Sequence, residues 1–225
     1  FFFKQKTAYE MCGRDWSSDV CSSDLRGLLA PKRTSLMAHA KPIATLRSAT
    51  GIPTGRLAIW WVLASEVVIF GGLLGAYLMH RIGHPEWAEA ASHTQTWIGA
   101  VNTFVLLTSS FTAVLAHQAA EKGDGKQAAK LLGLTILGAV TFLGIKSYEW
   151  TMEIMAGYTI TANTFWSFYY TAAGLHALHV IAGAIIMGVV AVDAYRGREL
   201  QRVELIGIYW HFVDVVWIFL FPLLY

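Results

Sequence analysis

Residues 57–79 read LAIWWVLASEVVIFGGLLGAYLM, and this stretch decides the fold. It contains one charged residue, Glu66, and no proline. About 20 consecutive apolar residues in a helix cross roughly 30 Å of hydrocarbon. A span in lipid must be helical, because lipid offers the backbone polar groups no hydrogen-bond partner. The stretch therefore predicts a transmembrane helix.

Four further apolar runs follow, over residues 97–117, 129–148, 165–192 and 205–225. Hydrophobic residues make up 55% of the 225-residue chain and the mean hydropathy is +0.47, whereas soluble domains are roughly 45–50% apolar. The sequence therefore predicts an all-α fold, a polytopic membrane protein built as a bundle of five transmembrane helices. The five runs leave no room for a soluble domain.

The distribution of charge predicts the orientation of these spans, although the net charge is only +2. Cytoplasmic loops of membrane proteins carry an excess of Lys and Arg. The loop after the first span has only Arg81, and residues 150–162 have no basic residue. The other connections are basic, which places the N-terminus in the cytoplasm and the C-terminus in the periplasm. The basic residues of the N-terminal tail and these connections are Lys32, Arg33, Lys41, Arg47, Arg56, Lys122, Lys126, Lys130, Arg196, Arg198 and Arg202.

The N-terminal region divides into two parts. Residues 1–25 resemble translated sequencing-adapter read-through, so we expect them to be non-native and Met37 to be the native start. This segment holds both cysteines, Cys12 and Cys21, which leaves no cysteine for a disulfide or a metal site in the membrane part. We expect residues 26–56 to form a polar, basic cytoplasmic tail and residues 57–225 to form the transmembrane domain.

Three ionisable residues inside the spans are candidates for a proton-linked or lipid-linked role. An ionised Glu66 at mid-membrane costs roughly 2.5–3.5 kcal/mol on insertion scales, so it must be paired, protonated or facing a wet cavity. A purely structural hydrogen bond is an equally good interpretation. His211 and Asp214 lie three residues apart on one helix face. If the first and last spans are neighbours, a contact between Glu66 and His211 is possible.

Other polar residues are interpreted mainly as structural. His176 and His179 could ligate haem or a metal, but no second such pair accompanies them, so hydrogen bonding is favoured. Asn102 and Ser109 share a face of the second span. Small residues favour close helix packing. Those singled out are Gly71 with Gly75, Ala173 with Ala177, and Gly133, Gly138 and Gly144, and a further ion pair is expected between Lys146 and Glu149.

Five segments together resemble one protein family, subunit III of the cytochrome c oxidases and other haem–copper terminal oxidases. They are WWVLASEVVIFGGLLGAYL, AVNTFVLLTSSFT, FLGIKSYEW, YYTAAGLHALHVIAGAI and YWHFVDVVWIFLFPLLY, in the family's order and spacing. Ala173 stands where the family favours a glycine-like position. The resemblance covers roughly residues 56–225. The chain lacks the two leading helices of the mitochondrial type, so it resembles the five-helix bacterial form.

The resemblance implies a non-catalytic subunit of a proton-pumping oxidase in the bacterial inner (plasma) membrane. Such a subunit holds no haem, copper or other metal, because these belong to the partner subunits. Its partners are subunit I, subunit II and membrane phospholipids, and no nucleic acid is expected. The resemblance assigns a proton-linked or lipid-linked role to Glu66 and His211. We group Glu149, Tyr209 and Trp210 with His176, His179 and Asn102 as structural or lipid-contacting residues.

Several alternatives stay open at this point. Five-helix chains of this kind also resemble subunit III of quinol oxidases and an accessory protein of nitric oxide reductases. The residues Ser65 and Glu66 favour cytochrome c as the electron donor of the complex. A transporter is disfavoured because five spans do not divide into equal repeats. A haem b cytochrome would have to use His176, His179 or His211.

Overall fold

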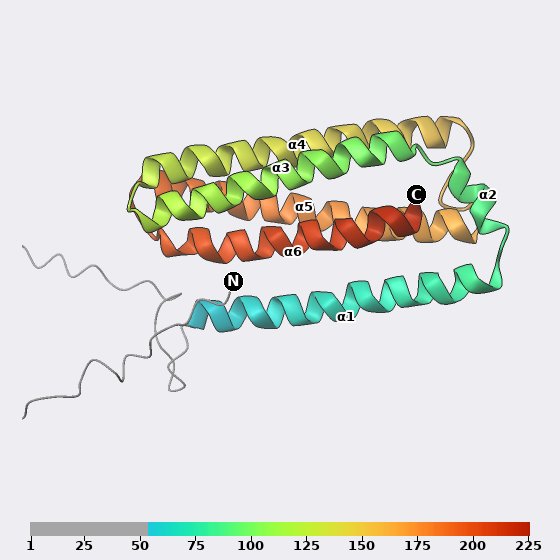
Figure 1. Cartoon of the computed structure of the whole chain (residues 1–225), viewed down its shortest axis with the longest axis horizontal. Helices are drawn as coiled ribbons and strands as arrows, with labels where there is room; N and C mark the ends of the chain where they lie inside the picture. The colour runs from blue at the N-terminus through green and yellow to red at the C-terminus, as the bar shows by residue number, and fades with distance from the viewer. Residues whose placement is uncertain (1–53) are drawn as a thin grey trace, which may run out of the picture. The chain divides into compact units, whose positions relative to one another are not determined.

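A computed structural model of the chain describes residues 54–225 and contains six helices there (Figure 1). The predictions for residues 1–25 and for almost all of the tail 26–56 therefore lie outside the described residues. The helices are α1 (Thr54–Gly83), α2 (Trp87–Ser92), α3 (Thr96–Glu121), α4 (Gly125–Met155), α5 (Thr164–Tyr195) and α6 (Gln201–Leu224). All except α2 are long and apolar enough to cross a membrane, which confirms the all-α membrane fold.

Most of the long helices extend a few residues beyond the apolar runs that predict them. Side-chain caps explain two of the starts, because an N-cap oxygen satisfies a free N–H group of the first turn. The Asp124 carboxylate accepts a hydrogen bond from the Gln127 backbone N–H at 2.9 Å. The Asn163 side chain does the same for Trp166 at 3.0 Å. The short helix α2 has no counterpart in the sequence predictions.

Helices α3 to α6 pack side by side (Figure 1). Most of the large buried side chains of the described residues belong to these helices. Trp166, Trp210, Trp217 and Phe142 are almost fully buried there. Aromatic side chains of this size bury a large area each and pack with defined ring geometries. The turns α3–α4 and α5–α6 lie with the start of α1 at one end, which we call the basic end. The opposite end is called the far end.

Helix α1 lies beside this bundle and buries little of its own surface (Figure 1). Its buried residues are Leu63, Phe70 and Tyr77, spaced seven apart. Such spacing gives a single narrow seam along one side of a helix. Most of the rest of α1, including Trp60 and Trp61, is exposed, so we expect polar contacts to help fix its position.

Two of these polar contacts lie at the ends of α1. At the basic end, Arg56 Nη2 forms an ion pair with Glu204 Oε1 of α6 at 2.6 Å. At the far end, the Tyr77 hydroxyl donates to the Leu223 carbonyl at 2.6 Å. Arg81 Nη1 in turn donates to the Tyr77 hydroxyl at 2.6 Å. Both ends of α1 are thus held to α6.

The small residues predicted as packing points behave differently from one another. Gly138 confirms the prediction, since an added Cβ there would lie 2.7 Å from the Ser109 Cβ on α3. Ala173 and Ala177 are buried between helices, also as predicted. The predictions for Gly71 with Gly75 and for Gly133 with Gly144 are wrong within the described residues. An added Cβ at each of these four glycines meets nothing within 4 Å, because each lies on an exposed face of its helix.

The close approach of α3 and α4 gives a stability prediction. We expect Gly138→Ala to destabilise the protein by about 1–2 kcal/mol, because the new methyl overlaps Ser109 and overpacking costs roughly 1–3 kcal/mol. Gly133→Ala on the same helix is the control. It meets no neighbour and gains the better helix propensity of alanine, so it should not lower stability. Unfolding of both variants in mild detergent, followed by circular dichroism, measures the difference.

Candidate functional site

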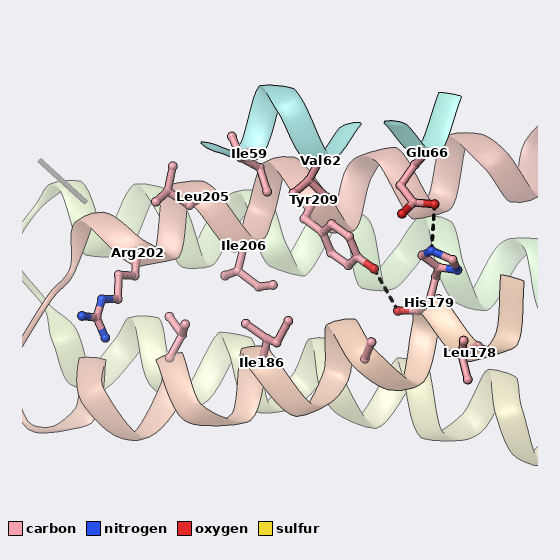
Figure 2. Close-up of a pocket in the computed structure, with 12 residues that line it drawn as sticks. Ile59, Val62, Glu66, Leu178, His179, Ile186, Arg202, Leu205, Ile206 and Tyr209 are labelled. Carbon is pink, nitrogen blue, oxygen red and sulfur yellow. Dashed lines mark hydrogen bonds and ion pairs between the residues drawn. The ribbon is translucent and has the colours of Figure 1, made fainter. Parts of the chain in front are cut away.

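An ion pair in the first half of α1 links this helix to α5 (Figure 2). The Glu66 Oε2 atom lies 2.9 Å from His179 Nε2, and both side chains are about 15% exposed. The other ring nitrogen, His179 Nδ1, lies 2.8 Å from the Leu175 carbonyl oxygen. A carbonyl only accepts hydrogen bonds, so Nδ1 carries a hydrogen. This contact fixes the ring orientation that presents Nε2 to Glu66.

The pair can hold one further proton, on either side of the contact. With the proton on Nε2, His179 is an imidazolium and Glu66 is a carboxylate. With the proton on Glu66, both groups are neutral. The net charge is zero in either form, which explains how a carboxyl is tolerated within a transmembrane helix. Chemically, the pair can pass a proton between its two members without creating a net charge in the membrane.

A cavity of about 520 Å³ begins at this pair and extends toward the basic end between α1, α5 and α6 (Figure 2). Glu66 and His179 line one end of it, and Arg202 lines the other. The lining between them is mostly aliphatic. The other lining residues are Ile59, Val62, Leu178, Ala182, Ile186, Val190, Leu205, Ile206 and Tyr209. The shape and chemistry suit a hydrocarbon chain, since ligand cavities combine apolar walls with a few polar groups.

The charge at the basic end of the cavity is nearly balanced. Arg202 Nη1 lies 3.1 Å from Asp193 Oδ2, and Arg202 Nε lies 3.3 Å from Glu199 Oε2. The Arg56–Glu204 ion pair lies at the same end of the bundle. Both arginines, Arg56 and Arg202, already have carboxylate partners, so the basic end of the cavity carries positive and negative groups together. Such a mixture fits a zwitterionic headgroup better than an anion alone.

The contact between Glu66 and His211 that the sequence left possible is not formed, because Glu66 pairs with His179. The His211 Nδ1 atom lies 2.6 Å from the Ser110 Oγ atom of α3. His211 therefore serves the α3–α6 contact, whereas the α6 residue that lines the cavity beside Glu66 is Tyr209. Tyr209 and His211 are two residues apart, which places them on opposite sides of α6. Asp214 is buried on α6.

His176 corrects the expectation that both histidines of α5 make structural hydrogen bonds. Its side chain is fully buried, and neither ring nitrogen has a hydrogen-bond partner in residues 54–225. The ring packs instead against Trp217 at 5.0 Å and Phe142 at 5.6 Å between centroids. The two rings lie about 60° apart around α5, and their contacts differ: His176 packs against Phe142 and Trp217 inside the bundle, whereas His179 contacts Glu66 of α1. In the described part of the chain, no three His, Cys, Asp or Glu side chains gather as a metal site requires.

The remaining predicted residues join pairs of helices. Asn102 Nδ2 donates to the Phe142 carbonyl at 3.5 Å, between α3 and α4. Trp210 Nε1 donates to Ser109 Oγ at 3.1 Å, between α6 and α3. The Tyr209 hydroxyl donates to the His179 carbonyl at 3.4 Å, between α6 and α5. Tyr209 thereby contacts the same residue that holds Glu66.

A second set of buried polar side chains lies at the far end of the bundle, and the sequence predicted only part of it. The pair Lys146–Glu149 is confirmed, with Nζ and Oε2 3.1 Å apart. The structure adds Glu153 from the next turn of α4 and the hydroxyls of Tyr169 and Tyr225. The spacing of Lys146, Glu149 and Glu153 already placed the three on one helix face. The tyrosines, which lie on α5 and just after α6, carried no such signal.

Comparison with known proteins agrees with this geometry. The family model for cytochrome c oxidase subunit III matches residues 44–225. The chain is 36% identical over 168 residues to cytochrome c oxidase subunit 3 of Thermostichus vulcanus, covering 72% of this chain and 82% of that protein. It is 33% identical over 196 residues to the Corynebacterium diphtheriae protein of that name, covering 84% and 94%.

A third relative has a longer chain. The heme-copper oxidase subunit I+III of Aeropyrum pernix is 32% identical over 181 residues, which cover 76% of this chain and 22% of that protein. The matched segments include all five spans and the residues that line the cavity. The described chain is therefore a multi-pass membrane protein that belongs to the cytochrome c oxidase subunit III family and forms part of an oxidase complex.

Proposed function

We propose that this chain is the non-catalytic subunit III of a proton-pumping cytochrome c oxidase in a bacterial plasma membrane. It packs against subunit I, which with subunit II carries the haem and copper centres, and sustains turnover there. The supporting observation is the Glu66–His179 pair at one end of an apolar cavity. A proton-holding pair beside a lipid-shaped space fits a subunit that assists proton uptake and retains phospholipid.

The basic end of the bundle lies in the cytoplasm in this proposal, as the positive-inside pattern indicates. The cavity then extends from the Glu66–His179 pair toward the side from which such an oxidase takes up protons. The name of the Aeropyrum protein, subunit I+III, supports a direct association of this chain with subunit I. The names of the other relatives favour cytochrome c as the electron donor of the complex.

A test of the proton role replaces Glu66 with glutamine in the purified oxidase. We expect Glu66→Gln to leave the chain in the complex but to reduce turnover several-fold at alkaline pH, where protons are scarce and a relay group matters most. Ser65→Ala is the control, because the Ser65 hydroxyl bonds only its own helix at Val62. Oxygen consumption as a function of pH measures both. Identical profiles for Glu66→Gln and the wild type would reject a proton role.

A second test addresses the lipid. Ala182→Trp would fill the cavity, since Ala182 lines it, and we expect the purified complex to lose one bound phospholipid. Ile185→Trp adds the same bulk on α5 at an exposed position outside the cavity, and should retain the lipid. Native mass spectrometry of the two complexes counts the lipids. Equal lipid retention in both would show that the cavity holds none.

Association with subunit I is tested by affinity purification of a tagged form of this chain from membranes. We expect a subunit with haem absorption to co-purify, and the chain separated from it to show no Soret band. A Soret band in the isolated chain would contradict the proposal and support a haem b cytochrome instead.

A further inference from the structure

A closed polar cluster at the far end of the bundle has no part in the proposed function. We call it the Lys146 cluster, and it consists of Lys146, Glu149, Glu153, Tyr169, Tyr170 and Tyr225. The side chains of Lys146, Glu149 and Glu153 are only 2%, 0% and 4% exposed. One cation and two carboxyls are therefore enclosed together. If both carboxyls were ionised, the cluster would bury a net charge of −1, which is strongly unfavourable.

The contacts of Lys146 fix the charge of Glu149. The ammonium group has three N–H donors and no acceptor, and it has three partners. They are Glu149 Oε2 at 3.1 Å, the Tyr169 hydroxyl at 2.9 Å and the Tyr225 hydroxyl. Tyr225 in turn donates to Glu149 Oε1. Both oxygens of Glu149 thus accept hydrogen bonds, as those of an ionised carboxylate do.

The contacts of Glu153 require one more hydrogen than the tyrosines supply. Tyr169 lies 2.9 Å from Glu153 Oε1 and 3.0 Å from Glu149 Oε1, but its hydroxyl has one hydrogen for the two carboxyls. Tyr170 lies 3.4 Å from Glu153 Oε2 and 2.8 Å from the Tyr158 carbonyl. Since the carbonyl only accepts, the hydrogen of Tyr170 belongs to that shorter contact.

We infer that Glu153 is a proton-binding site, a neutral carboxylic acid at neutral pH that donates a hydrogen bond to Tyr169 or Tyr170. The proton falls on Glu153 and not on Glu149 because Glu149 touches the ammonium group directly. The cluster is then neutral, with one ammonium, one carboxylate and one carboxylic acid. Within residues 54–225, the charged or titratable groups that act on Glu153 are the other members of the Lys146 cluster, from α4, α5 and Tyr225.

The inference distinguishes two carboxyls that look alike in the sequence. Glutamine reproduces a protonated carboxyl, because it has one oxygen that accepts and one nitrogen that donates. Glu153→Gln should therefore preserve the hydrogen bonds and the charge of the cluster. Glu149→Gln removes the one carboxylate that touches Lys146 directly. Glu153 would then have to lose its proton to balance the ammonium group, without a direct contact to it, and weakening a buried ion pair in this way is destabilising.

The test compares the two variants in the intact oxidase complex. We expect the unfolding midpoint of this chain to change by less than about 2 °C for Glu153→Gln and to fall by about 10 °C, or assembly to fail, for Glu149→Gln. Infrared spectroscopy gives the direct readout. The difference spectrum of wild type minus Glu153→Gln at neutral pH should contain the C=O stretch of a protonated carboxylic acid.

Either of two results would overturn the inference. One is a carboxylate band in place of the acid band in that difference spectrum. The other is a loss of stability in Glu153→Gln as large as in Glu149→Gln, since an ionised Glu153 could not be replaced by a neutral amide without cost. If Glu149→Gln does not assemble, the infrared measurement on Glu153→Gln still decides, because that variant keeps every expected contact.

Discussion

The contact between Glu66 and His179 is the interaction on which the arrangement of this protein depends most. Helix α1 buries only a narrow seam of Leu63, Phe70 and Tyr77, and lipid is as apolar as those side chains, so the hydrophobic effect gives little attraction between helices. A polar pair is different, because each partner would be costly alone in hydrocarbon. The pair therefore fixes both where α1 lies and which way it faces.

The same contact lies at one end of the cavity. Helix α1 is held at its basic end by Arg56 and Glu204 and farther along by Glu66 and His179, and between these two contacts α1, α5 and α6 line the cavity. Its walls are mostly aliphatic side chains. A proton-holding pair and a lipid-shaped cavity thus lie next to each other, which is the combination that the proposed role in an oxidase needs.

Helices α3 to α6 are held together mainly by side-chain packing, unlike α1. Their contacts combine buried aromatic rings, the close approach at Gly138 and hydrogen bonds such as Trp210 to Ser109. Interhelical hydrogen bonds in membranes contribute only about 0.6 kcal/mol each on average, so packing carries most of the stability here. The Lys146 cluster at the far end is the exception, since its charges can be buried only as a complete, mutually hydrogen-bonded set.

The sequence by itself determined the five spans, the all-α class and the i, i+3 pair of Lys146 and Glu149, because chain length in lipid and helix periodicity are local properties. It also singled out Glu66 as a residue that must be paired, protonated or facing a wet cavity. Only the tertiary structure decided that the partner is His179 and not His211, since the choice depends on which faces of α1, α5 and α6 meet. The same reason explains why Gly138 packs while Gly71 and Gly75 do not, and why Tyr169 and Tyr225, distant in sequence, complete the cluster around Lys146.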